Sequence, residues 1–129
     1  MVADGMLETE IKLRVERTIR RANEAPAIII LCRDTIRVNP QPDTLRQETE
    51  SIMGMQSVAA AGLQLLLAAH AEGLASSWIC WPLFAPQETR IALDLPSEWE
   101  PQGMLLLGYA ADSPNASERI PLEEIVRWN

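Results

Sequence analysis

The chain has 129 residues, of which 47% are apolar and 22% charged, which fits one folded domain and excludes a disordered segment. The net charge is −7 and no basic face is evident in the sequence. Nucleic acid and anionic membranes are therefore not expected partners. The two cysteines, Cys32 and Cys80, lie outside any CxxC or Cys/His grouping, which predicts reduced thiols in a cytoplasmic protein.

The first predicted element is an amphipathic helix over residues 6–22, because apolar side chains recur every four residues from Leu7 to Ile19. The run PAIIILC at residues 26–32 lacks alternation, so we expect a strand buried on both faces. Residues 33–43 are polar and contain two prolines, which predicts a loop. On the first helix, two ion pairs with the glutamate four residues before the arginine are expected: Glu10 with Arg14 and Glu16 with Arg20.

A long and almost wholly apolar helix is predicted over residues 45–72, about 40 Å in length. Asp43 or Thr44 fits its N-cap, and Gly73 fits a left-handed C-cap. Polar side chains are too few for a solvated stripe, so a second subunit is the expected cover. The apolar part falls short of the roughly 20 residues that cross a bilayer, which favours a core or interface helix. A narrow polar line, open to a ligand, a partner helix or a hydrated seam, is formed by Glu50, Ser57 and Gln64.

The second half of the chain predicts two further strands with a short helix between them. SSWIC at residues 76–80 fits a strand that Pro82 ends, and residues 85–93 fit a helix with proline in its first turn. GMLLLGYA at residues 103–110 fits a second buried strand, followed by a polar loop at 111–118. The last residues, 119–129, are expected to be extended or briefly helical, with Trp128 as an apolar anchor. The predicted fold is a single α+β domain over residues 1–129, with helices covering a small sheet.

The residue pattern alone assigns no reaction. No phosphate loop, dinucleotide fingerprint, zinc-binding helix or serine-nucleophile motif is present in the sequence. His70 lies near the end of the apolar helix, where a packed or capping role is expected. Cys80 fits either a buried structural thiol or a thiol that contacts a ligand. The sequence therefore predicts no catalytic residue and no metal ligand.

Three segments resemble the C-terminal portion of the FMN-dependent nitroreductase family, from about Pro26 to Val126. They are MQSVAAAGLQLLLAAHAEGLASSWICWPLF, LDLPSEWEPQGMLLLGYA and SERIPLEEIV, and their order and spacing are more specific than any one of them. Within that family, the chain most resembles the nitroreductase-like domain associated with deazaflavin-coenzyme glutamate ligases. The resemblance implies a nitroreductase-like sheet flanked by helices, a long helix central to the dimer interface, and an N-terminally truncated domain.

The resemblance also implies a homodimer with FMN at the interface and a nicotinamide or deazaflavin co-substrate. Backbone amides of the segment that matches Trp78, Ile79, Cys80 and Trp81 are expected near the flavin ring, where N–H donors favour its reduced form. In the tail motif, Arg119 is the residue expected at the FMN phosphate, and Ser117 offers a hydroxyl at a position that is basic in relatives. Hydride transfer belongs to the flavin, so no acid or base is nominated.

Two family features are absent from the sequence: the opening Arg-Arg-Ser-x-Arg motif and the Asn-x-Gln-Pro-Trp segment. Arg20-Arg21 only superficially resembles the first, because the apolar strand follows it directly. A separate polypeptide carrying the N-terminal half is therefore a further expected partner. One alternative is a non-catalytic dimerisation or coenzyme-binding remnant of the family, and another is a structural interaction module outside it.

Overall fold

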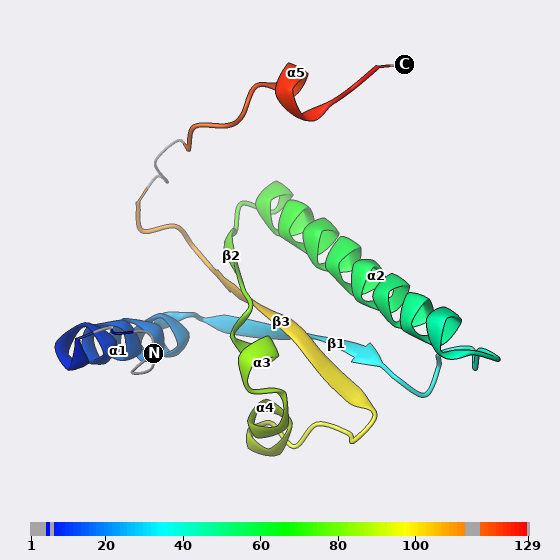
Figure 1. Cartoon of the computed structure of the whole chain (residues 1–129). Coiled ribbons are helices and arrows are strands. Elements are labelled where there is room, and N and C mark those ends of the chain that lie inside the picture. The colour runs from blue at the N-terminus through cyan, green and yellow to red at the C-terminus, as the bar shows by residue number, and fades with distance from the viewer. Residues whose placement is uncertain (1–4, 6, 113–116, 129) are drawn as a thin grey trace.

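The computed structural model describes residues 5, 7–112 and 117–128 (Figure 1). The elements are α1 (Glu8–Glu24), β1 (Ala27–Asp34), α2 (Thr44–Ala71), β2 (Ala75–Ile79), α3 (Trp81–Phe84), α4 (Pro86–Ala92), β3 (Trp99–Gly108) and α5 (Leu122–Ile125). Their order confirms the predicted alternation of helices and strands. It adds α3, a single turn that was not predicted from the sequence.

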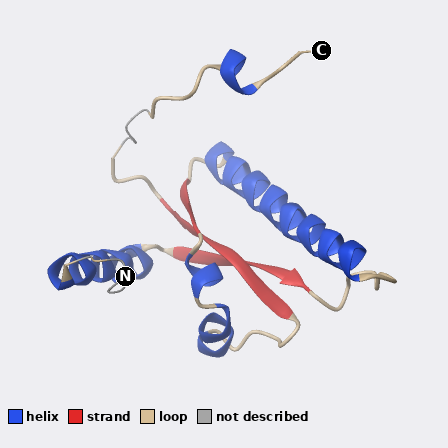
Figure 2. Ribbon diagram, in the orientation of Figure 1, coloured by secondary structure: helices blue, strands red, loops and turns tan. Residues whose placement is uncertain are grey.

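The three strands form one antiparallel sheet in the order β1-β3-β2, so the last strand of the chain lies in the middle (Figure 2). Trp78 of β2 lies opposite Leu105 of β3. On the other side of β3, a register shift between Leu31 and Cys32 marks a bulge or irregularity in the ladder. This small sheet with flanking helices confirms the predicted α+β fold class.

Both β1 and β3 are longer than predicted. β1 continues to Asp34, although a loop was expected from Arg33, and β3 begins at Trp99 rather than Gly103. The strands extend beyond their apolar residues because Arg33 lies opposite Glu100, and opposite charges stabilise a cross-strand pair. The additional length places a charged pair at one end of the sheet.

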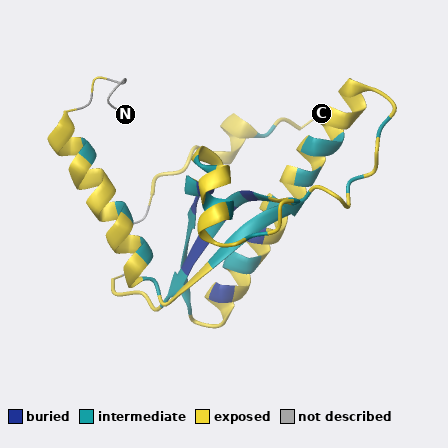
Figure 3. Ribbon diagram, turned by 90° about the horizontal axis from the view of Figure 1, so that it is seen from below, coloured by how far each residue is buried: buried dark blue, intermediate teal, exposed yellow. Residues whose placement is uncertain are grey.

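Helix α2 begins and ends as predicted. The side chain of Asp43 accepts a hydrogen bond from the Arg46 backbone N–H at 2.9 Å, and Gly73 has a φ of +78° just after the helix. The helix packs along one face of the sheet against all three strands, and α3 and α4 lie against β3 on the side away from α2 (Figures 1 and 3). Its buried residues are Gly62 and Ala69, whose small size allows a close approach to the sheet.

The described core is small (Figure 3). Its buried hydrophobic residues are Ala69, Ile79, Leu105 and Leu106. The prediction that the first strand is buried on both faces was wrong for the single chain, since each residue of β1 is exposed or half-buried. The reason is that β1 pairs only with β3 among the described residues, which leaves it at an edge of the sheet.

Much of α2 is uncovered in the single chain. Leu63 and Leu67 are 56% and 62% exposed, so the cover expected from a second subunit stays a prediction. The helix has 28 residues, and by length and composition it could cross a membrane, so the expectation that it is too short was wrong. One such helix is weak evidence of a membrane span; α2 packs against the sheet, and 11% of its apolar window is buried.

The described residues near the two ends of the chain are exposed or half-buried. α1 and α5 contain no buried residue, and α5 lies apart from the sheet (Figure 1). Trp128 is 86% exposed, so it is not an anchor within one chain. The predicted loop 111–118 lies partly outside the described residues.

The described ion pairs within α1 are Lys12–Glu16 and Arg20–Glu24, rather than the predicted ones. The reason is that exposed long side chains gain little free energy from any one pairing.

Candidate functional site

The predicted flavin-contacting residues lie together where β2 leads into α3. Trp78 and Ile79 end β2, Cys80 precedes the helix, and Trp81 begins it. Pro82 occupies the first turn of α3, where its missing N–H costs no helical hydrogen bond, and this explains why the strand stops here. Ile79 is buried, the two tryptophans are half-buried and Cys80 is exposed. We call residues 78–81 the β2–α3 junction.

Trp78 fixes the junction to the rest of the fold. Its indole ring lies so close to Gly62 of α2 that a Cβ built on this glycine would stand 2.2 Å from Trp78 Cζ3. On β3, a Cβ built on Gly103 would lie 3.4 Å from the indole nitrogen. The indole N–H donates a hydrogen bond to Cys80 Sγ at 3.2 Å. The ring therefore contacts α2, β3 and the end of its own strand.

Exposed apolar surface continues beyond the junction. Phe84 is 87% exposed and Leu83 is 50% exposed, and both belong to α3. Such a surface fits one side of a planar apolar ring, whereas the residues of the junction include one titratable side chain, the Cys80 thiol. The described part of the chain contains no group of His, Cys, Asp and Glu suited to a metal ion. The described side chains of the junction thus offer apolar surface and a single thiol.

The tail residues predicted to bind phosphate lie elsewhere. Ser117 and Arg119 are exposed and precede α5, a helix that Figure 1 shows apart from the sheet. The fold therefore brings Trp78–Trp81 together but does not bring Ser117 and Arg119 to them within one chain. A complete flavin, with ring and phosphate, fits the single chain only in part.

A polar cluster that was not predicted from the sequence joins α2, β1 and β3. Arg33 Nε donates to Glu100 Oε2 at 2.8 Å, and its NH1 donates to Ser51 Oγ at 2.6 Å and to the Ser51 carbonyl at 3.1 Å. The Arg33 side chain is 15% exposed, so these partners replace most of its contact with water. The charged residues were visible in the sequence, but their pairing depends on strand register. The cluster has a structural role, because its hydrogen bonds satisfy the guanidinium inside the protein.

A second cysteine lies in a hollow of about 500 Å³ between β1 and α2. Burial raises the pKa of Cys32 above its ordinary value of 9.0. The group is therefore a neutral thiol at physiological pH, and its chemistry is that of a small apolar side chain.

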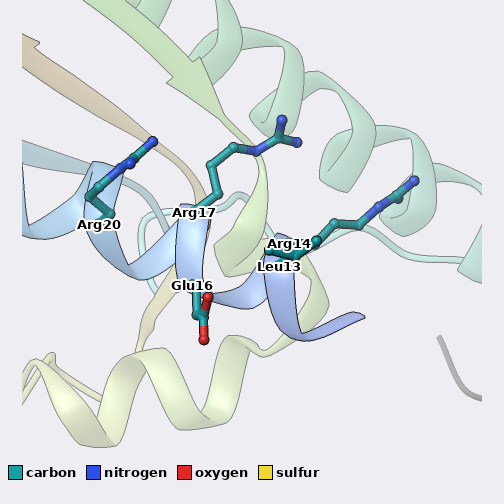
Figure 4. Close-up of a pocket in the computed structure, with 5 residues that line it drawn as sticks. All are labelled: Leu13, Arg14, Glu16, Arg17 and Arg20. Atoms are coloured by element: carbon teal, nitrogen blue, oxygen red, sulfur yellow. The ribbon is translucent and has the colours of Figure 1, made fainter. Parts of the chain in front are cut away.

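The face of α1 shown in Figure 4 carries a different kind of hollow, of about 660 Å³. Three arginines and one glutamate line it, which makes it basic in an otherwise acidic chain. It contains no aromatic side chain and lies on a helix with no buried residues, so we do not place a ring-binding site there. Its described lining residues are Leu13, Arg14, Glu16, Arg17 and Arg20.

Residues 6–109 match the model of the Nitroreductase family. Among solved structures, a nitroreductase family protein from Clostridium difficile 630 is 33% identical, with a TM-score of 0.55 over 81% of this chain and 60% of that one. NfrA2 of B. megaterium is 23% identical, with a TM-score of 0.70 over 81% of this chain and 46% of that one. A proposed nitroreductase of Exiguobacterium sibiricum, solved in complex with FMN, is 19% identical, with a TM-score of 0.59 over 99% of this chain and 51% of that one.

These comparisons bear differently on fold and on chemistry. The likenesses at 23% and 19% identity concern the fold, and they confirm the nitroreductase-like arrangement. The chain spans between 46% and 66% of the length of eight solved structures that it matches. The matched region ends at residue 109, so the tail residues Ser117 and Arg119 lie outside it.

Proposed function

Since the chain belongs to the nitroreductase family, we propose that two copies of it form an FMN-dependent oxidoreductase. It would pass hydride or electrons from NAD(P)H or a reduced deazaflavin to a small acceptor. Family membership supports an oxidoreductase in general terms. The half-buried junction, continued by the exposed side chains of Leu83 and Phe84, offers an apolar surface suited to a planar ring. That junction, held by Trp78 beside the uncovered helix α2, is the observation on which the proposal depends.

The homodimer is supported by the exposed apolar side chains of α2. Met53, Leu63 and Leu67 are each more than half exposed along this one helix. A helix this apolar is stable in water only when another surface covers it, and two copies of the same helix give a self-complementary contact. We therefore place α2 at the centre of the interface.

We propose that FMN binds between the two copies, with its ring against Trp78, Ile79, Cys80 and Trp81. When bound, FMN supplies the hydride and electron chemistry, and the chain supplies binding and orientation. The exposed tail of one copy would bring Ser117 and Arg119 to the phosphate at the junction of the other. The planar guanidinium of Arg119 suits phosphate because it donates two parallel charge-assisted hydrogen bonds.

The test is titration of the purified chain with FMN, followed by absorbance and by flavin fluorescence. We expect uptake with a Kd on the order of 1 μM, about −8 kcal/mol, by a protein with the solution mass of a dimer. Arg119→Ala should weaken uptake about tenfold, whereas Arg127→Ala, a change at another exposed tail arginine, should leave it unchanged. A monomeric chain that takes up no FMN at 100 μM contradicts the proposal.

The electron donor and the setting are part of the same proposal. We propose a role beside deazaflavin-coenzyme glutamate ligases, in the cytoplasm, where the free thiols Cys32 and Cys80 stay reduced. Mixing the FMN-loaded dimer separately with NADH, NADPH and a reduced deazaflavin, and following flavin bleaching, distinguishes the donors. We further propose that residues 1–129 act as one partial domain, which a separate polypeptide with the N-terminal half completes.

The second candidate is a non-catalytic dimerisation or coenzyme-binding remnant. It is favoured by the position of Arg119, which lies outside the region that matches the family and in a tail segment without buried residues. This candidate predicts a dimer that stays colourless in excess FMN. Restoration of FMN uptake by an added N-terminal half would favour the split enzyme over the remnant.

A further inference from the structure

We propose that Trp78 is a positioning residue that holds the thiol of Cys80 and the turn at residues 79–81 in the geometry required by the flavin, and that it links this turn to α2. The inference rests on the flavin site proposed above. It adds a residue that acts through its neighbours, and a coupling between the dimer helix and the cofactor site.

The first observation is the slot in which the indole ring lies. Gly62 of α2 and Gly103 of β3 flank the ring, and any side chain at Gly62 would collide with it or with Leu31 Cδ1. A ring confined between a helix and a strand has few rotamers left, because close-packed neighbours leave no room for rotation. Trp78 is therefore held in place by α2 and β3, and not by residues 79–81 that follow it.

The second observation is the hydrogen bond between Trp78 Nε1 and Cys80 Sγ at 3.2 Å. Indole N–H is a donor only, so the sulfur accepts this bond and the S–H remains directed elsewhere. Cys80 is exposed, and the residue after it begins α3. The hydrogen bond thus restrains the Cys80 side chain, which would otherwise rotate freely at the surface where the flavin ring is proposed to lie.

The third observation connects the slot to the proposed interface. Gly62 faces Trp78, while the next residue, Leu63, is 56% exposed on the uncovered surface of α2. Any movement of α2 on dimerisation acts on the indole ring, because the ring has no free space at Gly62. Binding at the junction and covering of α2 are then coupled, and the coupling is reciprocal: FMN tightens the dimer as much as dimerisation tightens FMN binding.

The experiment compares Trp78→Phe, Cys80→Ala and the double variant in the full chain. Trp78→Phe keeps an aromatic ring in the slot but removes the N–H, and Cys80→Ala removes the acceptor at an exposed position that does not threaten folding. Trp99→Phe is the matched control, because Trp99 donates no hydrogen bond from its indole among the described residues. The readouts are the Kd for FMN, the flavin absorption maximum, and the indole N–H and backbone resonances measured by NMR without flavin.

Each single variant should weaken FMN binding roughly three- to tenfold, as expected for one hydrogen bond, and the double variant should weaken it no further than the larger single effect. Cys80→Ala should also shift the Trp78 indole N–H resonance and the amide resonances of residues 79–81 in the flavin-free protein. Additive effects on the Kd, or an unmoved indole resonance, would overturn the inference.

The two proposals fail in different ways. If the unaltered chain takes up no FMN, the proposed flavin site fails. The resonances of the flavin-free protein then still decide whether Trp78 positions the turn. If FMN binds the unaltered chain and both single variants equally, with the same flavin spectrum, the flavin site stands and the positioning role is wrong. Trp99→Phe should change neither the Kd nor the resonances of residues 78–81.

Discussion

Replacement of Gly62 by alanine tests the close approach of α2 to Trp78. A Cβ at this position would lie 2.2 Å from Trp78 Cζ3 and 2.6 Å from Leu31 Cδ1. Carbon atoms pack at about 3.5 Å or more, so the helix and the indole ring must separate by about 1.3 Å, or the ring must leave its slot. The change therefore acts on the packing of α2 against the whole sheet.

The expected cost follows from two opposing terms. Inserting a methyl group into a packed site costs about 1–3 kcal/mol, and the shift needed here places Gly62→Ala at the upper end. Against this, alanine in a helix interior is about 1 kcal/mol better than glycine. We expect a net destabilisation of roughly 2 kcal/mol, or a melting temperature lower by roughly 8 °C for a chain of this size.

The measurement is urea unfolding followed by tryptophan fluorescence, at one fixed protein concentration because dimerisation shifts apparent stability. Gly54→Ala, in the same helix, is the matched control. Its Cβ would meet the Arg33 side chain at 3.0 Å, so the helical gain should offset most of the cost. Trp78→Phe should relieve the clash, so the double variant should be less destabilised than the sum of the single changes. A neutral or stabilising Gly62→Ala, or strict additivity with Trp78→Phe, would refute the packing argument.

Three other predictions use the same unfolding assay. Glu100→Gln should lower the free energy of unfolding by about 1–2 kcal/mol, because the Arg33 side chain, which is 15% exposed, loses its charged acceptor. The control is Glu88→Gln at an exposed position of α4, which should have no measurable effect. Asp43→Ala should cost about 1 kcal/mol through loss of the N-cap bond, and Asp43→Asn should retain most of it. Burial raises the pKa of Cys32 above 9.0, so the folded state holds the thiol proton more tightly than the unfolded state. Stability should therefore be unaffected by this group below pH 9 and should fall as the pH rises above it, and Cys32→Ala should remove that part of the fall.

Local signals in the sequence were sufficient for most elements of this fold. The Asp43 N-cap, the left-handed Gly73 and the apolar periodicity of α2 each depend on a few neighbouring residues, so they could be predicted without the structure. The polar cluster at Arg33 could not, because its contacts join residues 18 and 67 positions apart and depend on strand register. A strand end defined by opposite charges looks like a loop when its partner strand is not yet known.

The candidate site likewise combines features that neighbouring residues predict with contacts between distant residues that the sequence does not predict. The junction residues adjoin one another in the sequence, and their resemblance to a family segment was enough to nominate them together. The slot that holds Trp78 could not be predicted, because Gly62 and Gly103 come to flank the indole ring only when α2 packs against the sheet.

The arrangement of the site also gives a physical reason why the activity should depend on association. One chain carries the junction at the end of β2 and an exposed arginine in the tail before α5, and Figure 1 shows α5 apart from the sheet. Its own core buries four hydrophobic side chains among the described residues, while long apolar side chains of α2 stay in water. Covering α2 with a second copy would remove that apolar surface from water, and the proposed site also requires the tail of that copy at the junction. The same event that stabilises the fold would then complete the binding site, so loss of dimerisation and loss of flavin uptake should accompany each other.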